Sequence, residues 1–276
     1  MIVVKLYGGL AGQMLQYAVG RHLSIKNNTK LYLDLDWYKI KQNENYPRIF
    51  NLDCYQTKFK VYDKKTRLFN KFINNLEIVK ESDFSKFDKN ILLLGNNSYL
   101  DGYFNSFLYF QQIQDVLKKD FQLNQKLDED NLIMLKKITS CNSVAVHIRR
   151  GDYLLTDFHG VLSIEYYVKS IELINSNIEN SVFFIFSDDI HWVENHFKDI
   201  LLSLQVCFII VNNNNDYTNY KDMYLMKNCK NFILANSSFG WWSAWLSDSK
   251  GMKIAPERWV NSGIKMENIP VDWILL

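Results

Sequence analysis

The fold is decided by the stretch SVAVHIRRGD, which occupies residues 143–152. Its first six residues are mostly apolar and rich in β-branched side chains, a pattern that predicts a buried strand. The run ends directly in two arginines, a glycine and an aspartate. Because ligands of open parallel sheets bind outside the carboxyl ends of the strands, charged residues at this point indicate a ligand site in an α/β protein.

The same pattern recurs further along the chain. The apolar run 182–186 ends in the polar residues 187–189, and the run 231–235 ends in the polar residues 236–238. Ser163 is expected to cap a helix, because its hydroxyl can accept from the free amides of a first turn. Further strands are predicted at 206–211 and 253–255, and helices at 163–175, 191–197, 219–229 and 239–248. This alternation predicts an α/β fold around a parallel sheet.

The N-terminal part begins in the same way. A strand is predicted at 2–6, a helix at 13–27 and a second strand at 31–35, with a turn at Gly8 and Gly9 after the first strand. Residues 38–94 show no clear pattern, and helical spacing returns at 108–117. The chain thus has four strand ends with glycines or polar side chains, and we expect them to share one ligand cleft.

Length and composition limit the alternatives. At about 150 residues per domain, the 276 residues predict two domains. The 32 basic and 30 acidic side chains leave a net charge of +2, so nucleic acid is not expected as the main partner. The apolar run 206–211 is among the longest, far below the roughly 20 residues that cross a bilayer.

The cysteines and the N-terminus predict a cytoplasmic protein. Cys54, Cys141, Cys207 and Cys229 show no CxxC spacing, and Cys141 and Cys207 are expected to be small buried residues beside strands. The opening MIVVKLYGG lacks the basic and long apolar regions of a signal peptide.

The charged clusters each allow two interpretations. Arg149 and Arg150 suit a diphosphate, because guanidinium groups bind phosphate oxygens bidentately, but they could instead pair with Asp152. Asp188 and Asp189 could accept hydrogen bonds from a base or a ribose, or cap a helix. Ser237 and the serine after it could bind an anion at a helix N-terminus, or serve as an ordinary cap.

Other features predict no additional chemistry. No third carboxylate or imidazole lies at ligand spacing, so no metal site is expected. Gly8 and Gly9 do not complete the GxGxxG pattern of dinucleotide sites. Trp241, Trp242 and Trp245 have helical spacing and are expected in the core, with a platform for a sugar as the alternative.

Four blocks, in order, carry a family resemblance. They are YGGLAGQMLQYA at 7–18, HIRRGDYL at 147–154, FSDDIHWV at 186–193 and NSSFGWWSAWL at 236–246. They resemble the motifs of the α-1,2-fucosyltransferases and of their α-1,6 and protein-O relatives. Two departures are visible: Ala11-Gly12 replaces the usual Gly-Asn, and Gly240 and Ser243 exchange the usual Ser and Gly. The chain is similar to the bacterial galactoside α-1,2-fucosyltransferases of glycosyltransferase family 11.

The resemblance implies a GT-B type α/β fold of two Rossmann-like domains that face each other across a cleft. Residues 1–140 would form the acceptor-side domain and 141–276 the domain that binds GDP-β-L-fucose, with the last residues free to pack back on the first domain. A galactose-terminated glycan is the implied acceptor. A lipid-linked acceptor would bring peripheral membrane contact. No cofactor and no metal are expected, and no nucleic acid.

The resemblance also implies roles for single residues. Arg149 would contact the diphosphate near His147, Asp188 would read the guanine edge, and Phe239 would pack beside the base. The predicted donor-binding residues are His147, Arg149, Arg150, Asp188, Ser237, Ser238, Phe239 and Gly9. The predicted catalytic residues are Arg149, Asp152 and His159.

The implied reaction is an inverting displacement in which galactose O2 attacks fucose C1 and GDP leaves. Arg149 would stabilise the negative charge that develops on the β-phosphate. Asp152 and His159 are both candidates for the general base, but Asp152 could instead pair with an arginine and His159 could orient the acceptor. The alternatives are a fucosyltransferase of another linkage and a non-catalytic module that binds a sugar nucleotide.

Overall fold

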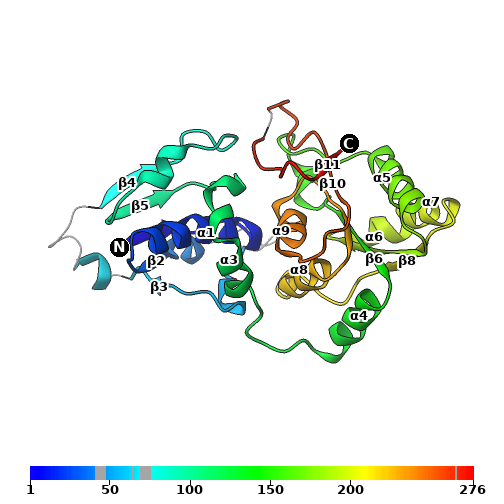
Figure 1. Cartoon of the computed structure of the whole chain (residues 1–276), viewed down its shortest axis with the longest axis horizontal. Coiled ribbons are helices and arrows are strands. Elements are labelled where there is room, and N and C mark those ends of the chain that lie inside the picture. Colours follow the sequence, from blue (N-terminus) through cyan, green and yellow to red (C-terminus); the bar gives the residue numbers. More distant parts are fainter. Residues whose placement is uncertain (41–47, 64, 69–75, 265) are drawn as a thin grey trace. The chain divides into compact units, whose positions relative to one another are not determined.

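Short β-branched runs form two separate parallel sheets, seen in a computed structural model that describes residues 1–40, 48–63, 65–68, 76–264 and 266–276. Contacts divide the chain into two units (Figure 1). The first contains Met1–Gln125 and Met266–Ile269, and the second contains Lys126–Lys265 and Pro270–Leu276.

The first unit is built on a five-stranded sheet in the order β3-β2-β1-β5-β4. All of its pairings are parallel. Its strands are β1 (Ile2–Lys5), β2 (Leu31–Asp34), β3 (Lys60–Val61), β4 (Glu77–Lys80) and β5 (Ser98–Asp101). Its α-helices include α1 (Leu10–Lys26) and α3 (Gln114–Asp120). Short 3₁₀ turns lie at Asp36–Lys39, Leu52–Cys54, Lys89–Leu93, Phe107–Tyr109 and Gln111–Ile113.

The second unit is built on a six-stranded parallel sheet in the order β11-β10-β9-β6-β7-β8. Its strands are β6 (Asn142–Ile148), β7 (Ser181–Ser187), β8 (Cys207–Ile210), β9 (Asn231–Ile233), β10 (Lys253–Ala255) and β11 (Ile274–Leu275). Its α-helices are α4 (Glu129–Thr139), α5 (Ile164–Asn177), α6 (Ile190–Trp192), α7 (Lys198–Ser203), α8 (Asn219–Lys227) and α9 (Ser238–Leu246), with a 3₁₀ turn at Asp152–Leu155. This is the Rossmann strand order, and the order reverses between β6 and β9.

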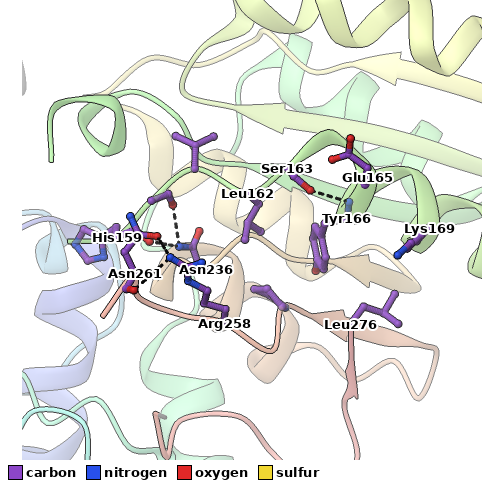
Figure 2. Close-up of a pocket in the computed structure, with 13 residues that line it drawn as sticks. His159, Leu162, Ser163, Glu165, Tyr166, Lys169, Asn236, Arg258, Asn261 and Leu276 are labelled. Carbon is purple, nitrogen blue, oxygen red and sulfur yellow. Dashed lines mark hydrogen bonds between the residues drawn. The ribbon is translucent and has the colours of Figure 1, made fainter. Parts of the chain in front are cut away.

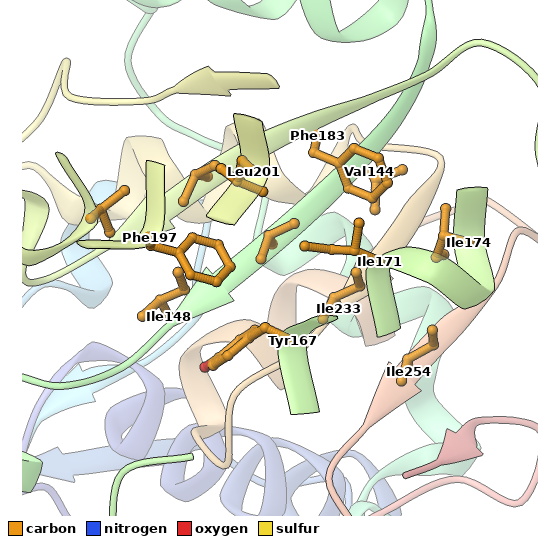
Figure 3. Packing of buried hydrophobic residues seen from close by; sticks show 13 residues of the cluster. Val144, Ile148, Tyr167, Ile171, Ile174, Phe183, Phe197, Leu201, Ile233 and Ile254 are labelled. Atoms are coloured by element: carbon orange, nitrogen blue, oxygen red, sulfur yellow. The ribbon is translucent and has the colours of Figure 1, made fainter. Parts of the chain in front are cut away.

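The core of the second unit lies between its sheet and the helices α5 and α7. Val144 and Ile148 of β6 point into a cluster with Tyr167 and Ile171 of α5 and Leu201 of α7 (Figure 3). Because successive residues of a strand point to opposite faces, Ala145 and His147 face the other side of the sheet, and both are also buried. Because β6 is a central strand that is buried on both faces, its sequence is a nearly continuous apolar run.

Most predicted elements are present, with some differences. The predicted helix at 191–197 covers the end of α6 and a π-helical turn at Val193–Phe197, and the helical stretch continues beyond the predicted end into α7. The helical spacing at 108–117 corresponds to two 3₁₀ turns that lead into α3. The expectation of two buried cysteines was wrong, because Cys207 is exposed and Cys141 is half-buried. Cys207 lies on β8, which is an edge strand of the sheet.

The division between the units falls at 125/126, earlier than the expected boundary at 140/141. The reason is that α4 packs against β6 and α8 of the second unit. Met266–Ile269 group with the first unit, where the Glu267 N–H donates to Ser85 O (3.0 Å). The last residues instead form β11, which pairs with β10. Within the described ranges, no helix is long and apolar enough to cross a membrane.

Candidate active site

Three of the four polar strand ends lie side by side, because β9, β6 and β7 are neighbours in the second sheet. The Arg150 N–H, directly after β6, donates to Asp188 Oδ1 after β7 (2.9 Å). The Tyr153 hydroxyl donates to Asn236 O after β9 (3.1 Å). The candidate site is therefore the carboxyl edge of this sheet at its topological switch point.

Arg149 is held between two carboxylates. Its Nη2 lies 2.6 Å from Asp152 Oδ1 and its Nη1 lies 3.0 Å from Asp188 Oδ2. Burial disfavours the charged guanidinium, but these carboxylates outweigh burial and raise the pKa of Arg149. Its Nε is buried and has no hydrogen-bond partner among the described residues. The guanidinium is thus fixed and charged, and it retains an unused donor that an anionic ligand could satisfy.

Arg150 points toward β7 and α6. Its Nε lies 3.2 Å from Asp189 Oδ2, and its guanidinium lies 4.0 Å from the centre of the Trp192 ring. Asp189 also caps α6, since its Oδ1 accepts from the Trp192 N–H (3.0 Å). Asp189 is therefore a helix cap, which is one of the two interpretations given above. Asp188 is not a cap here, because its two oxygens contact Arg149 and the Arg150 N–H.

His147 is almost completely enclosed. It is 4% exposed, its Nδ1 has no partner in the described chain, and its ring centre lies 5.7 Å from that of Phe239. Burial, with a contribution from Arg149, lowers the pKa of His147 to about 3, so the imidazole is neutral at physiological pH. A Cβ at Gly240 would lie 2.7 Å from His147 Nδ1, which explains the glycine at that position.

The serines after β9 lie at the start of α9. Ser237 is the N-cap, and its hydroxyl accepts from the Phe239 N–H (3.3 Å). Ser238 is the first residue of the helix and is half-buried. Trp241, Trp242 and Trp245 of α9 are buried, so their expected core role is confirmed. The first turn of α9 is therefore the part of the helix that remains available to a ligand.

His159 stacks on Tyr153, with ring centres 4.3 Å apart and planes 7° from parallel. The Arg149 guanidinium lies 5.4 Å from the centre of the same Tyr153 ring. Burial lowers the pKa of His159. The Asp152 carboxylate raises this pKa and the Arg149 guanidinium lowers it. The structure thus brings the three predicted catalytic residues together around Tyr153, a residue that the sequence analysis did not single out.

The loop that carries His159 is held by two asparagines. Asn236 Nδ2 lies 3.1 Å from each of three carbonyl oxygens, those of His159, Gly160 and Trp259. Asn261 Nδ2 donates to Asp157 O (2.8 Å). The sequence marks Asn236 only as the start of a motif block and gives no signal for Asn261, because the contacts of each with this loop span more than seventy residues.

Gly9 belongs to the first unit, where it is the N-cap residue of α1. Gly8 before it has a φ of +78°, which favours glycine, and a Cβ at Gly9 would lie 3.2 Å from Arg48 Nη1. A Cβ at Gly12 would lie 3.3 Å from Tyr103 Cε1, so a larger residue there would require the Tyr103 ring to shift. No group of three or more His, Cys, Asp or Glu side chains within the described ranges could hold a metal ion.

Comparison with known proteins identifies the family. A sequence profile described as "Glycosyl transferase family 11" matches residues 3–276. The chain belongs to glycosyltransferase family 11. This glycosyltransferase is 36% identical to an Alpha-1,2-colitosyltransferase of Escherichia coli, over 94% of this chain and 92% of the relative. It is 31% identical to the O-antigen biosynthesis glycosyltransferase WbnK of Escherichia coli, over 98% of this chain and 99% of the relative.

The fold of the glycosyltransferase also matches solved structures. A crystal structure of POFUT1 in complex with GDP-fucose aligns with a TM-score of 0.51 and 13% sequence identity, over 91% of this chain and 95% of that chain. At this identity the likeness concerns the fold alone. It agrees with the two Rossmann-like units described above and with a GT-B type architecture.

Proposed function

We propose that this glycosyltransferase moves L-fucose from GDP-β-L-fucose to O2 of a galactose residue in an acceptor glycan and forms an α-1,2 linkage. The observation that carries the proposal is the placement of Arg149 at the switch point of a Rossmann sheet, charged and with an unused donor. The four ordered motif blocks and the α-1,2 specificity in the name of one relative support the linkage.

In the proposed reaction, galactose O2 attacks fucose C1 while the bond from C1 to the β-phosphate oxygen breaks. The electron pair of that bond leaves with GDP, and the configuration at C1 inverts. Arg149 stabilises the charge that develops on the β-phosphate, assisted by the first turn of α9 at Ser237 and Ser238. His147, Arg150, Asp188 and Phe239 complete the proposed donor site in the second unit.

The proton of galactose O2 goes to Asp152 in this proposal. Asp152 pairs with Arg149 Nη2, and a phosphate oxygen would compete for the same donor. Donor binding would thereby free a carboxylate oxygen to act as the base. His159, which is uncharged at neutral pH, would orient the acceptor galactose.

The donor sugar is the main alternative, because one relative is named for colitose. Colitose is L-fucose without its 3-hydroxyl group. A site that hydrogen-bonds this hydroxyl would strongly disfavour the deoxy sugar, whereas a site that does not would accept both. Initial rates with GDP-fucose and GDP-colitose in parallel, with lactose as acceptor, separate the two donors.

The test of the proposal is a reaction of the purified protein with GDP-fucose and lactose, followed by linkage analysis of the product. We expect a fucosyl-α-1,2-galactose linkage and stoichiometric release of GDP. Another linkage, or GDP binding without release, would contradict the proposal.

Because Arg149 is assigned the stabilisation of the charge on the leaving group, a metal ion is not needed for it. We therefore expect the same transfer rate with and without excess EDTA. A loss of rate that Mg²⁺ or Mn²⁺ restores would contradict that assignment. A cytoplasmic location and a lipid-linked O-antigen or capsule unit as the natural acceptor are further parts of the proposal.

A further inference from the structure

The phenol ring of Tyr153 lies among the proposed catalytic residues, although no step of the proposed reaction uses it. Tyr153 belongs to the 3₁₀ turn Asp152–Leu155. This turn is tied to the end of β6, because the Leu154 N–H donates to Arg150 O (2.9 Å). Burial raises the pKa of Tyr153 to about 12, and the Arg149 guanidinium opposes this rise. The phenol is therefore neutral at physiological pH, and any role of Tyr153 comes from the contacts of its ring and its hydroxyl.

Two contacts fix the position of the Tyr153 ring. Its hydroxyl donates to Asn236 O after β9 (3.1 Å), and the His159 imidazole stacks on it with ring centres 4.3 Å apart. Figure 2 shows the His159 ring turned away from the cavity beside α5, while Asn236 Nδ2 donates to the carbonyl oxygens of His159 and Gly160. The ring of Tyr153 is thus held by β9 and by the loop before α5.

This fixed ring lies against the Arg149 guanidinium. The guanidinium lies over the ring, 5.4 Å from its centre, within the roughly 6 Å at which a cation is attracted to an aromatic face. The same guanidinium pairs through Nη2 with Asp152 and through Nη1 with Asp188. Arg149 therefore has three anchors, which are two carboxylates and one aromatic ring.

A second arginine, in the first unit, has the same three kinds of anchor. Arg67 Nη2 lies 2.7 Å from Asp34 Oδ1, and its Nη1 lies 2.7 Å from Asp36 Oδ2. Its guanidinium lies 5.1 Å from the centre of the Tyr62 ring. The two arginines differ at Nε, because Arg67 Nε donates to Tyr62 O (3.3 Å), whereas Arg149 Nε has no partner within the described ranges. The arrangement at Arg67 is complete by itself, and the one at Arg149 keeps a donor for an anion.

The ring matters most when a phosphate reaches Arg149. In the proposed function, a phosphate oxygen competes with Asp152 for Arg149 Nη2, so one of the three anchors is released during the reaction. Asp188 then holds Nη1 alone, and rotation about this contact would move the other two nitrogens away from the phosphate. The Tyr153 ring restricts that rotation because it covers one face of the guanidinium. Donors that are held in place need no reorganisation as charge develops on the phosphate.

We infer that Tyr153 is a positioning residue, whose ring keeps the Arg149 guanidinium on the leaving phosphate while Asp152 turns to the proton of galactose O2. The inference rests on the proposed function, because it requires a leaving phosphate at Arg149. The charge on that phosphate is largest in the transition state. Loss of the ring should therefore lower kcat while the KM for GDP-fucose changes little.

The experiment removes the ring and the hydroxyl separately. Tyr153→Leu and Tyr153→Met both remove the ring, and the flexible methionine fills an irregular space well. Tyr153→Phe removes only the hydroxyl and its hydrogen bond to Asn236 O. Tyr62→Leu is the matched control, because it removes the ring from the same arrangement at Arg67. Melting temperature, kcat and the KM for GDP-fucose, with lactose as acceptor, are measured for each variant.

We expect both ringless variants to lower kcat about 10²-fold, the scale of a catalytic group displaced by about 1 Å. Tyr153→Phe should keep most of the wild-type kcat, and folded Tyr62→Leu should keep all of it. Added to Arg149→Ala, Tyr153→Leu should cause no further loss of kcat, because the ring acts through this arginine.

A wild-type kcat in either ringless variant would overturn the inference. An equal loss in Tyr153→Phe would also overturn it, because the effect would then belong to the hydrogen bond with Asn236. So would a full further loss in the Arg149→Ala background, or a raised KM for GDP-fucose with an unchanged kcat. If the wild-type protein transfers no fucose to lactose, the proposed function itself fails, before any variant is compared.

Discussion

Strand β1 of the first unit and strand β6 of the second hold equivalent positions. Each is the first strand of its unit, and each lies where the strand order reverses, next to β5 and β9 respectively. β1 leads through Gly8 and Gly9 directly into α1, whereas β6 leads into Arg149 and Arg150 and then into a loop before α5. The same topology therefore presents two different chemical surfaces.

The end of β1 is surrounded by phenol groups. The rings of Tyr7 and Tyr103 lie 4.7 Å apart, and the Tyr38 hydroxyl donates to Gly8 O (3.0 Å). Burial raises the pKa of all three tyrosines, so these phenols are neutral at physiological pH. The end of β6 instead carries guanidinium groups that are already paired with carboxylates. Neutral phenols suit a hydroxylated ligand, whereas a fixed guanidinium suits a developing anion.

The largest expected effect on turnover concerns Arg149 at the charged end of β6. Arg149→Ala should lower turnover by at least about 10²–10³-fold, because a preorganised donor to the leaving phosphate is lost. Arg149→Lys should not restore the rate, since lysine keeps the charge but lacks the planar guanidinium. Initial rates of GDP release with lactose measure both variants.

The matched control is Arg21→Ala in the first unit, where Arg21 Nε lies 2.8 Å from buried Asp120. It should lower the free energy of unfolding by about 3 kcal/mol and leave the turnover of the folded protein unchanged. Near wild-type transfer by Arg149→Ala would contradict the assignment of leaving-group stabilisation to the arginine at the end of β6.

The next effect concerns the base. Asp152→Asn should lower turnover by about 10²-fold, because the amide cannot take the proton of galactose O2, while it still accepts from Arg149. GDP affinity, measured by calorimetry, should change little. Asp101→Asn at the end of β5, where Asp101 pairs with Lys5 (2.9 Å), is the control in the first unit. Full turnover by Asp152→Asn would return the role of base to His159 or another group.

Alanine substitutions at two glycines distinguish a packing defect from a loss of GDP binding. A Cβ at Gly20 would lie 2.4 Å from Val4 Cγ2, and a Cβ at Gly240 would lie 2.7 Å from His147 Nδ1. Alanine at either position should lower the free energy of unfolding by about 1–3 kcal/mol. Only Gly240→Ala should also weaken GDP binding, because His147 is assigned to the donor site. Gly95→Ala, with nothing within 4 Å of its Cβ, is the neutral control for thermal melts and GDP titrations. Equal GDP affinities would remove His147 from the donor site.

The smallest effect concerns a carboxyl group of the second unit outside the arginine cluster. Burial raises the pKa of Asp222 to about 6 from the ordinary value of 3.8, against the opposing hydrogen bond from Asn214. The stabilisation that this group provides is present below pH 3.8 and is lost as the pH rises through about 6. Asp222→Asn should therefore raise the melting temperature at pH 7.5 more than at pH 4, without changing transfer. An equal shift at both pH values would show that folding does not raise the pKa of Asp222.

Local signals in the sequence were sufficient to predict many of the strands and helices of the second unit. The strand at 253–255 was predicted with the bounds of β10, and Ser163 caps α5 through the Tyr166 N–H, as expected. By contrast, β4 (Glu77–Lys80) is largely exposed and has no apolar alternation that could reveal it. β5 inserts between β1 and β4, and such a pairing depends on contacts far apart in the chain.

The sequence by itself determined the α/β class and the strand that ends in Arg149, because apolar runs and charged turns are local properties of the chain. Only the tertiary structure decided which carboxylate faces which guanidinium, since Asp188 reaches Arg149 from the neighbouring strand. It also revealed that Asn236 holds the His159 loop and that Gly240 leaves room for His147. These relations arise where strands distant in sequence become neighbours in the sheet, and no local pattern of residue types encodes them.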